Sequence, residues 1–327
     1  MADVVVAMIS LQDIQKARNS IRGEVKKTPL MRSQYLSSLT GSDVYLKLEN
    51  LQVTNAFKIR GALNRMMNLT AEEKARGIVA ASSGNHAQAV SVGAEKLKVT
   101  ATLVVPATTP KIKIEKIRQH NVELILHGNQ YDYAEQYALK LAKEKGLTYV
   151  SSYNDPYVVA GQGTVGLEIL EDLPTVDSIV VPVSGGSILS GVAVAAKGIK
   201  PTVEVLGVQP ENVAAMYHCL KAGKIINIPM RPTIAEGLDG NMEQGCITFD
   251  LVRRYVDEIL LCNEGAIKRM IRILWEKEKQ VVEASGAVAI APIVDTPKRF
   301  AGKRTVAVIT GGNIDETVFQ QILASGK

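Results

Sequence analysis

The chain has 327 residues, of which 46% are hydrophobic and 22% charged, an ordinary composition for a globular protein of two domains or one large one. Its net charge of +5 is mild, and no Lys/Arg run is interleaved with aromatic residues, so a nucleic-acid-binding groove is not expected. The three cysteines, Cys219, Cys246 and Cys262, lack metal-ligand spacing, so we expect reduced thiols in a cytoplasmic protein.

The N-terminal apolar run, Val4 to Ile9, is too short to cross a bilayer. It lacks the basic segment and the small-residue cleavage site that a secretory signal carries. We therefore expect neither secretion nor a membrane partner.

Short apolar segments alternate with helical patterns along the rest of the chain. A helix is expected over residues 131–145, ended by Gly146. This alternation is typical of α/β proteins, whose parallel strands are buried under helices on both faces. In chain order, the expected strands are 44–48, 78–81, 101–105, 122–126, 149–151, 178–183, 203–208 and 305–309.

Two motifs have residues suited to a lysine-based site and to an anion. Lys58 lies in the segment Asn55 to Ala62, and a lysine that forms a Schiff base needs a lowered pKa, which burial or a cationic neighbour such as Arg60 would favour. Ser82 to His86 lies between a strand and a helix, where free backbone N–H groups suit a carboxylate. The structural alternatives are an exposed lysine at a helix start and a serine helix cap.

Two further motifs contain paired glycines after a strand. Ser184 to Ile188 precedes a helix, and its glycines let the backbone approach an anion, which predicts a phosphate cradle. It is neither a Walker A loop nor a GxGxxG fingerprint, so a dinucleotide is not favoured. Thr310 to Asn313 follows the last predicted strand and alone would be only a strand-end turn.

In this order and at these separations, the four motifs resemble those of the pyridoxal phosphate (PLP) enzymes of the serine/threonine dehydratase and serine racemase family. The resemblance runs from Thr28-Pro29-Leu30 to Asn313. It implies PLP fold type II, similar to the tryptophan synthase β-subunit, with two open, mostly parallel twisted sheets covered by helices. It also implies a small domain (52–149) inserted in a large one (1–51 and 150–327), and a homodimer or higher homo-oligomer.

The resemblance also implies how pyridoxal 5′-phosphate and a small amino-acid substrate would bind. Lys58 would form the Schiff base beside Phe57 and later act as base at the substrate α-carbon. Asn85 would bond the cofactor's 3′-oxygen, with Glu283 near the ring and Thr310 at the pyridine nitrogen. The phosphate would be held by Ser184, Gly185, Gly186, Ser187 and Ile188, and the substrate carboxylate by Ser82, Ser83, Gly84, Asn85 and His86. His86 is given no proton-transfer role.

These roles favour β-elimination of a small L-hydroxyamino acid, L-threonine or L-serine, to a 2-oxo acid and ammonia. A hydroxyl at Thr310 does not keep the pyridine nitrogen protonated, so chemistry that needs a long-lived carbanion is disfavoured. The sequence ends soon after Asn313, so we expect no C-terminal regulatory domain like that of biosynthetic threonine dehydratases.

Three alternatives stay open. A serine or other amino-acid racemase is one, because the family's racemases carry a catalytic serine where Ser83 stands, and a hydroxyaspartate dehydratase is another. The third is an α/β binding protein that has no covalent cofactor. The loop around Glu236 is expected to help choose the substrate side chain.

Three departures from the family pattern bear on these expectations. The racemases' Mg²⁺ or Ca²⁺ carboxylates are replaced by Gln209 and Ala215, so no metal is expected. Asn55 replaces the usual glycine. Serines end the usual four-glycine run, and a serine in a left-handed backbone conformation would be strained.

Overall fold

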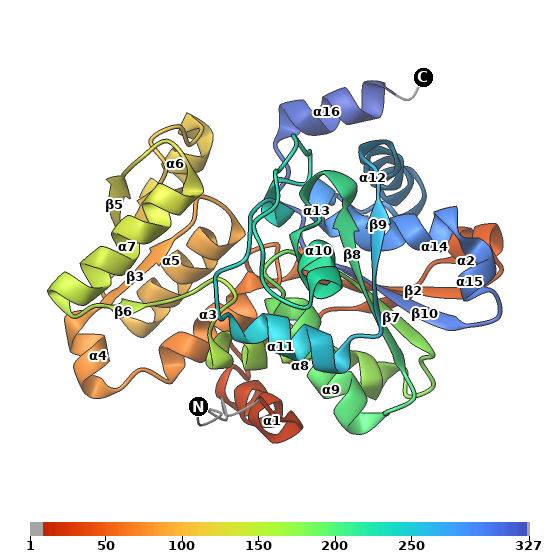
Figure 1. Cartoon of the computed structure of the whole chain (residues 1–327), viewed down its shortest axis with the longest axis horizontal. Helices are drawn as coiled ribbons and strands as arrows, with labels where there is room; N and C mark the ends of the chain where they lie inside the picture. The colour runs from red at the N-terminus through yellow and green to blue at the C-terminus, as the bar shows by residue number, and fades with distance from the viewer. Residues whose placement is uncertain (1–8, 326–327) are drawn as a thin grey trace.

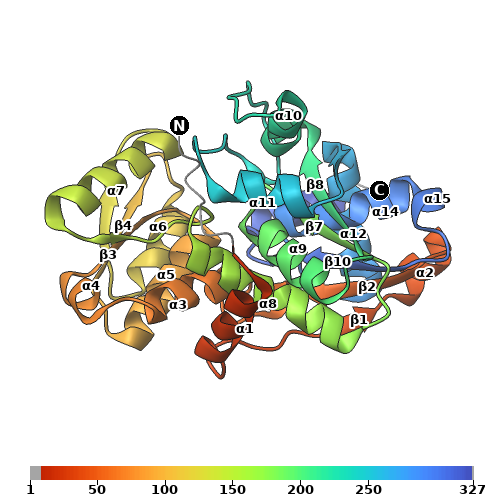
Figure 2. The same cartoon turned by 60° about the horizontal axis from the view of Figure 1, so that its bottom comes forward.

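The computed structural model describes residues 9–325, so the apolar run Val4 to Ile9 lies outside it except for its last residue. Two separate sheets organise the chain, with helices packed around each of them (Figures 1 and 2). All strand neighbours are parallel except β1 and β2. The predicted α/β class with two mostly parallel, helix-covered sheets is confirmed.

The six-stranded sheet has the order β1-β2-β10-β7-β8-β9 and the four-stranded sheet has the order β5-β4-β3-β6. The larger sheet contains β1 (Leu30–Arg32), β2 (Asp43–Leu48), β10 (Arg304–Ile309), β7 (Ser178–Pro182), β8 (Glu204–Pro210) and β9 (Glu258–Cys262). The smaller contains β5 (Glu123–Leu126), β4 (Ala101–Val105), β3 (Ile78–Ala81) and β6 (Thr148–Tyr149).

Every strand that the sequence predicts is present, with ends shifted by a residue or two. β1 and β9 were not predicted. Both are edge strands of the larger sheet, so each pairs on one side only and is only partly buried, which weakens the apolar pattern by which buried strands are recognised.

Sixteen α-helices are present in the described part of the chain. The predicted helix is confirmed as α7, which ends at Gly146 in a left-handed conformation with φ of 66°. The helices are α1 (Leu11–Ser20), α2 (Gln34–Thr40), α3 (Lys58–Met67), α4 (Ala71–Arg76), α5 (Asn85–Leu97), α6 (Lys111–Arg118), α7 (Tyr131–Lys145), α8 (Pro156–Asp172), α9 (Ser187–Ile199), α10 (Ala215–Ala222), α11 (Ile247–Tyr255), α12 (Glu264–Glu278), α13 (Ala284–Ala287), α14 (Ala291–Asp295), α15 (Pro297–Phe300) and α16 (Glu316–Ala324).

Alternate residues of each strand enter different cores. In the smaller sheet, Ile78 and Ala80 pack with α3 and α5, whereas Val79 and Ala81 pack with α7. In the larger sheet, β7 behaves likewise: Val180 faces the core shared with α12, while its neighbours face α8 and α9. Burial on both faces explains why these strands are continuous apolar runs.

The smaller sheet uses only chain between residues 78 and 149, and both flanks build the larger sheet. The exact domain limits at 52 and 149 stay a prediction. Between Ile9 and Ser325, no helix is both long enough and apolar enough to cross a membrane.

Candidate active site

Three of the four motifs lie just after the carboxyl ends of parallel strands. Ser82 to His86 follows β3 in the smaller sheet, whereas the loops after β7 and β10 belong to the larger sheet. Ligands of open α/β sheets bind at such carboxyl ends. Lys58 is instead the first residue of α3.

Lys58 and the glycine-rich loop meet at one backbone carbonyl. The Lys58 Nζ donates a hydrogen bond to the Ser152 carbonyl oxygen at 2.9 Å, and the Ser187 Oγ donates to the same oxygen at 3.3 Å. The Lys58 Nζ also lies 5.1 Å from the centroid of the Phe57 ring. The structure therefore places Lys58 beside the predicted phosphate loop.

The Lys58 amine has the lowered pKa that a Schiff-base lysine needs. Burial lowers its pKa to about 8, against the opposing attraction of the Glu283 carboxylate. Arg60 does not contribute the expected help, because its side chain forms buried ion pairs with Glu49 and Glu168.

The backbone conformation of Asn55 explains why related sequences usually have glycine at this position. Its φ is 53°, a left-handed conformation that asparagine tolerates better than most other residues. The turn is tied to the end of β10, because Phe57 N–H donates to the Thr310 carbonyl at 3.1 Å and Gly312 N–H donates to the Asn55 carbonyl at 2.8 Å. Lys58 is thereby fixed next to the Thr310 loop.

Asn85, at the start of α5, and Glu283, just before α13, form a pair between two distant parts of the chain. The Asn85 amide donates to the Glu283 carboxylate at 2.7 Å, and Asn313 donates to the Asn85 oxygen at 2.8 Å. Burial raises the pKa of Glu283 to about 7, although the Asn85 hydrogen bond opposes that rise. The Thr310 hydroxyl is buried and lies 3.5 Å from the Ser285 carbonyl oxygen, so it is at most weakly engaged.

The loop from Ser184 to Ile188 can surround a small anion. Gly186 has φ of 91°, so glycine rather than either flanking serine takes the left-handed position. The serines that end this loop therefore cause no backbone strain. The first turn of α9 has no side-chain cap, which leaves its N–H groups for a ligand. Thr248 holds the loop by a 2.6 Å hydrogen bond to the Gly185 carbonyl.

The loop from Ser82 to His86 is more open. Gly84 is the N-cap residue of α5 and makes no side-chain cap hydrogen bond, so neither serine caps the helix. The Ser82 Oγ accepts a hydrogen bond from Gly84 N–H at 3.2 Å. Buried His86 lies 2.9 Å from the Val150 carbonyl oxygen through Nε2, and burial lowers its pKa to about 3, which keeps the ring neutral at physiological pH.

The loop after β8 is held by an amide. Gln209 accepts a hydrogen bond from Tyr217 N–H at 2.9 Å and donates to the Val213 carbonyl at 3.3 Å. Within residues 9–325, no group of three or more His, Cys, Asp or Glu side chains is arranged to hold a metal ion.

Sequence reasoning missed three residues of this region: Ser152, Tyr153 and Thr248. Their only signal is spatial, since Tyr153 packs against Gly185 and Thr248 bonds the same residue. Asn313 belonged to a recognised motif, but its bonds to Asn85 and to the Thr54 carbonyl at 2.8 Å were not foreseen.

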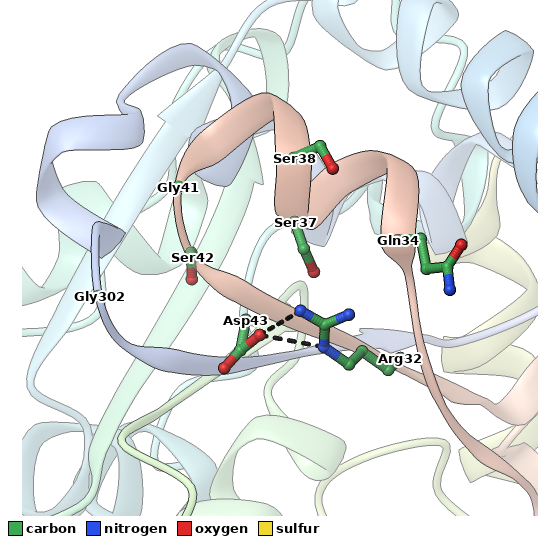
Figure 3. A pocket seen from close by; sticks show the side chains of 8 residues that line it. All are labelled: Arg32, Gln34, Ser37, Ser38, Gly41, Ser42, Asp43 and Gly302. Carbon is green, nitrogen blue, oxygen red and sulfur yellow. Dashed lines mark hydrogen bonds and ion pairs between the residues drawn. The ribbon is translucent and has the colours of Figure 1, made fainter.

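A hollow elsewhere on the surface, about 490 Å³ in volume, contains none of these residues (Figure 3). It lies at the start of β2, where Arg32 donates to Asp43 at 3.0 Å. Both of these side chains are about half exposed. The hollow is therefore lined by an ordinary surface ion pair and small polar residues.

Comparison with known proteins places this site in a class. Residues 21–311 match the family model described as "Pyridoxal-phosphate dependent enzyme", and the chain belongs to that family. It is 44% identical to an L-threonine ammonia-lyase of Thermotoga maritima, over 98% of this chain and 79% of that protein.

Two solved structures show the same fold. The processed form of threonine deaminase isoform 2 from Solanum lycopersicum matches with a TM-score of 0.91 and 32% identity, over 97% of this chain and 87% of that one. Maize serine racemase matches with a TM-score of 0.90 and 33% identity, over 97% of each chain. These are PLP enzymes of fold type II, and this protein is likewise PLP-dependent.

The residues present fit that cofactor. A side chain at Gly185 would overlap the Tyr153 ring, so only a glycine leaves the loop backbone in its present place. An uncapped helix start suits the phosphate, and a partly buried amine with a pKa of about 8 suits a Schiff base with the aldehyde.

Proposed function

We propose that this protein is an ammonia-lyase that converts L-threonine or L-serine to a 2-oxo acid and ammonia. The observation that carries the proposal is the lowered pKa of the Lys58 amine, placed beside the loop from Ser184 to Ile188. The similarity to a threonine ammonia-lyase over nearly the whole chain supports the same reaction.

We propose the following roles for the side chains. Lys58 Nζ, as the free amine, takes the proton from the substrate α-carbon. The uncapped start of α5 holds the substrate carboxylate with its N–H groups, and Asn85 orients the ring from beside Glu283. The cofactor, when bound, supplies the electron withdrawal that lets the β-hydroxyl leave.

A neutral substrate side chain is favoured over that of hydroxyaspartate. Lys113 and Glu236 act electrostatically on Glu283 and pair with each other at 2.7 Å across the two parts of the chain. Lys113 is thus already paired with a carboxylate, which disfavours a substrate with a second carboxylate.

The central experiment replaces Lys58 by Ala, with Lys140→Ala as an exposed control. We expect Lys58→Ala to lose the yellow absorbance of the bound cofactor and to lower 2-oxo acid formation by about a thousandfold or more. The control should resemble the wild type. Retention of both signals by Lys58→Ala would refute the assignment.

Racemisation is the second candidate, because the Ser83 hydroxyl forms no hydrogen bond with the residues described and is free to transfer a proton. Incubation with L-serine, following pyruvate and D-serine together, separates the two reactions. D-serine that disappears in Ser83→Ala while pyruvate persists would assign the racemase activity to Ser83.

We also propose a cytoplasmic homodimer or higher homo-oligomer with a small domain over residues 52–149. The three cysteines are buried and unpaired, which supports a reducing compartment. Light scattering would measure the assembly, and limited proteolysis near residues 52 and 149 would test the domain limits.

A further inference from the structure

One helix, α8, lies between the two elements that hold the opposite ends of the cofactor site. Figures 1 and 2 show α8 between α3 and α9. Helix α3 begins at Lys58, and helix α9 begins at Ser187 in the glycine-rich loop. The distance between the lysine and the loop therefore depends on how closely α8 packs against each neighbour.

The contact between α3 and α8 is made at two glycines. A methyl group on Gly161 would lie 2.6 Å from the Arg60 carbonyl oxygen and 2.7 Å from the Gly61 Cα. A methyl group on Gly61 would lie 2.7 Å from the Val158 carbonyl oxygen. Because these neighbours are backbone atoms, any side chain here must push the helices apart.

The contact between α8 and α9 repeats the arrangement two residues further along α8, on the opposite side of that helix. A methyl group on Gly191 would lie 2.5 Å from the Gly163 N atom, and one on Gly163 would lie 2.9 Å from the Gly191 carbonyl oxygen. None of these four glycines has a positive φ, so close approach rather than backbone conformation requires them.

Arg60 locks the first of these contacts. Its guanidinium is 1% exposed and donates to Glu49 Oε2 at 2.8 Å, to Glu168 Oε1 at 2.6 Å and to the Thr164 hydroxyl at 3.1 Å. Lys47 bonds the same Glu168, so two buried cations balance two buried carboxylates. Because Arg60 is only two residues from Lys58, its bonds to Thr164 and Glu168 also hold Lys58 close to α8.

We propose that the stack of α3, α8 and α9, with Gly61, Gly161, Gly163, Gly191 and Arg60 as positioning residues, sets the spacing between Lys58 and the phosphate loop. The stack makes the two ends of the site act together on one ligand. It does not touch the cofactor itself, and the proposal holds whichever amino acid the protein acts on.

A ligand held at both ends binds more tightly than one held at a single end, by a factor that depends on correct spacing. Pyridoxal 5′-phosphate engages both ends, whereas phosphate-free pyridoxal engages only Lys58. The ratio of their dissociation constants therefore measures the spacing and cancels any general loss of folded protein.

The experiment titrates full-length protein, stripped of cofactor, with each compound and follows the absorbance of the Lys58 adduct. Gly161→Ala inserts a methyl group 2.6 Å from a backbone carbonyl oxygen of α3. Gly166→Ala is milder and acts at the α8–α9 contact instead, since its methyl group would lie 2.9 Å from the Ala195 methyl and 3.0 Å from the Val192 carbonyl oxygen. Arg60→Lys keeps the positive charge but loses the planar guanidinium that bonds Glu49 and Glu168 together. Gly265→Ala in α12 is the control, because its nearest neighbour is a side-chain oxygen at 3.2 Å.

We expect the preference for the phosphorylated compound to fall by about tenfold or more in Gly161→Ala and Arg60→Lys, and by less in Gly166→Ala, with pyridoxal binding little changed. Gly265→Ala should match the wild type. If the ratio stays within about twofold of the wild-type value in every variant that retains its far-ultraviolet circular dichroism, Gly166→Ala among them, the proposal is wrong. Failure of the proposed lyase reaction would not alter this ratio, so the two results are separable.

Discussion

The two loops that begin α9 and α5 have the same local plan and different surroundings. Each follows a buried parallel strand and precedes an uncapped helix start. Around Gly185 the loop is closed in by the Tyr153 ring, whereas a methyl group on Gly84 would meet no atom within 4 Å. One loop is closely packed and the other has open space beside it.

This difference matches two tasks. A phosphate that stays bound through many turnovers is best held by a backbone that cannot move. A substrate that enters and leaves needs room, which the partly exposed residues from Ser82 to Asn85 provide. The following changes would break or sharpen this contrast, in order of decreasing expected effect.

Gly185→Ala should damage the closed loop most. The new methyl group would overlap the Tyr153 ring, whose Cδ carbons would lie 2.7 Å away, so loop or ring must move. We expect cofactor affinity to fall by about a hundredfold, an effect measurable by titration of the cofactor-free protein. Unchanged affinity would show that the loop is less rigid than its packing indicates.

His86→Gln should change how stability depends on pH. The pKa of His86 falls from 6.5 to about 3 on folding, so the unfolded chain takes up the proton first and stability is lost as pH falls below 6.5. At pH 5 this loss is about 2 kcal/mol, and the variant should not suffer it. Urea unfolding at pH 7 and pH 5 measures the difference.

The exposed His218→Gln serves as the control for that experiment and should keep the wild-type dependence. Glu283 titrates in the same window with the opposite sign, because burial raises its pKa from 4.5 to about 7. It is present in every variant compared, so it cancels. A His86→Gln protein as acid-sensitive as the wild type would contradict the assignment.

Glu283→Gln should lower the pKa of Lys58 from its wild-type value of about 8. The carboxylate favours the charged ammonium, whereas the amide does not. The pH dependence of Schiff-base formation by cofactor-free protein would show the shift. An apparent pKa that stays constant would mean that Glu283 is already protonated when Lys58 titrates, and one that rises would contradict the attraction between the two groups.

Gly84→Ala should have the smallest effect of the series. Its φ of −119° is accessible to any residue and space is free around it, so cofactor affinity should stay within about twofold of the wild type. The Michaelis constant for the amino acid is the sensitive measurement, since we propose that this loop holds the substrate carboxylate. A cofactor loss as large as that of Gly185→Ala would erase the contrast between the loops.

Much of the fold and of the site could be predicted from local sequence. The continuous apolar strands, the helix ended by Gly146 and the four motifs depend on residues close in the chain. The edge strands β1 and β9 were missed because edge pairing leaves no continuous buried run. Within the site, Lys58 and the glycine-rich loop were recognised, but Ser152, to which both bond, was not.

The sequence by itself indicated the class of enzyme, because the four motifs that resemble the family each consist of residues close together in the chain. Only the tertiary structure decided which glycine takes the left-handed turn, that Arg60 bonds Glu49 and Glu168 instead of assisting Lys58, and that Lys58 has a pKa of about 8. These features come from contacts such as that between Lys58 and Ser152, which are 94 positions apart. Burial and electrostatic fields depend on such distant neighbours, and no local pattern encodes them.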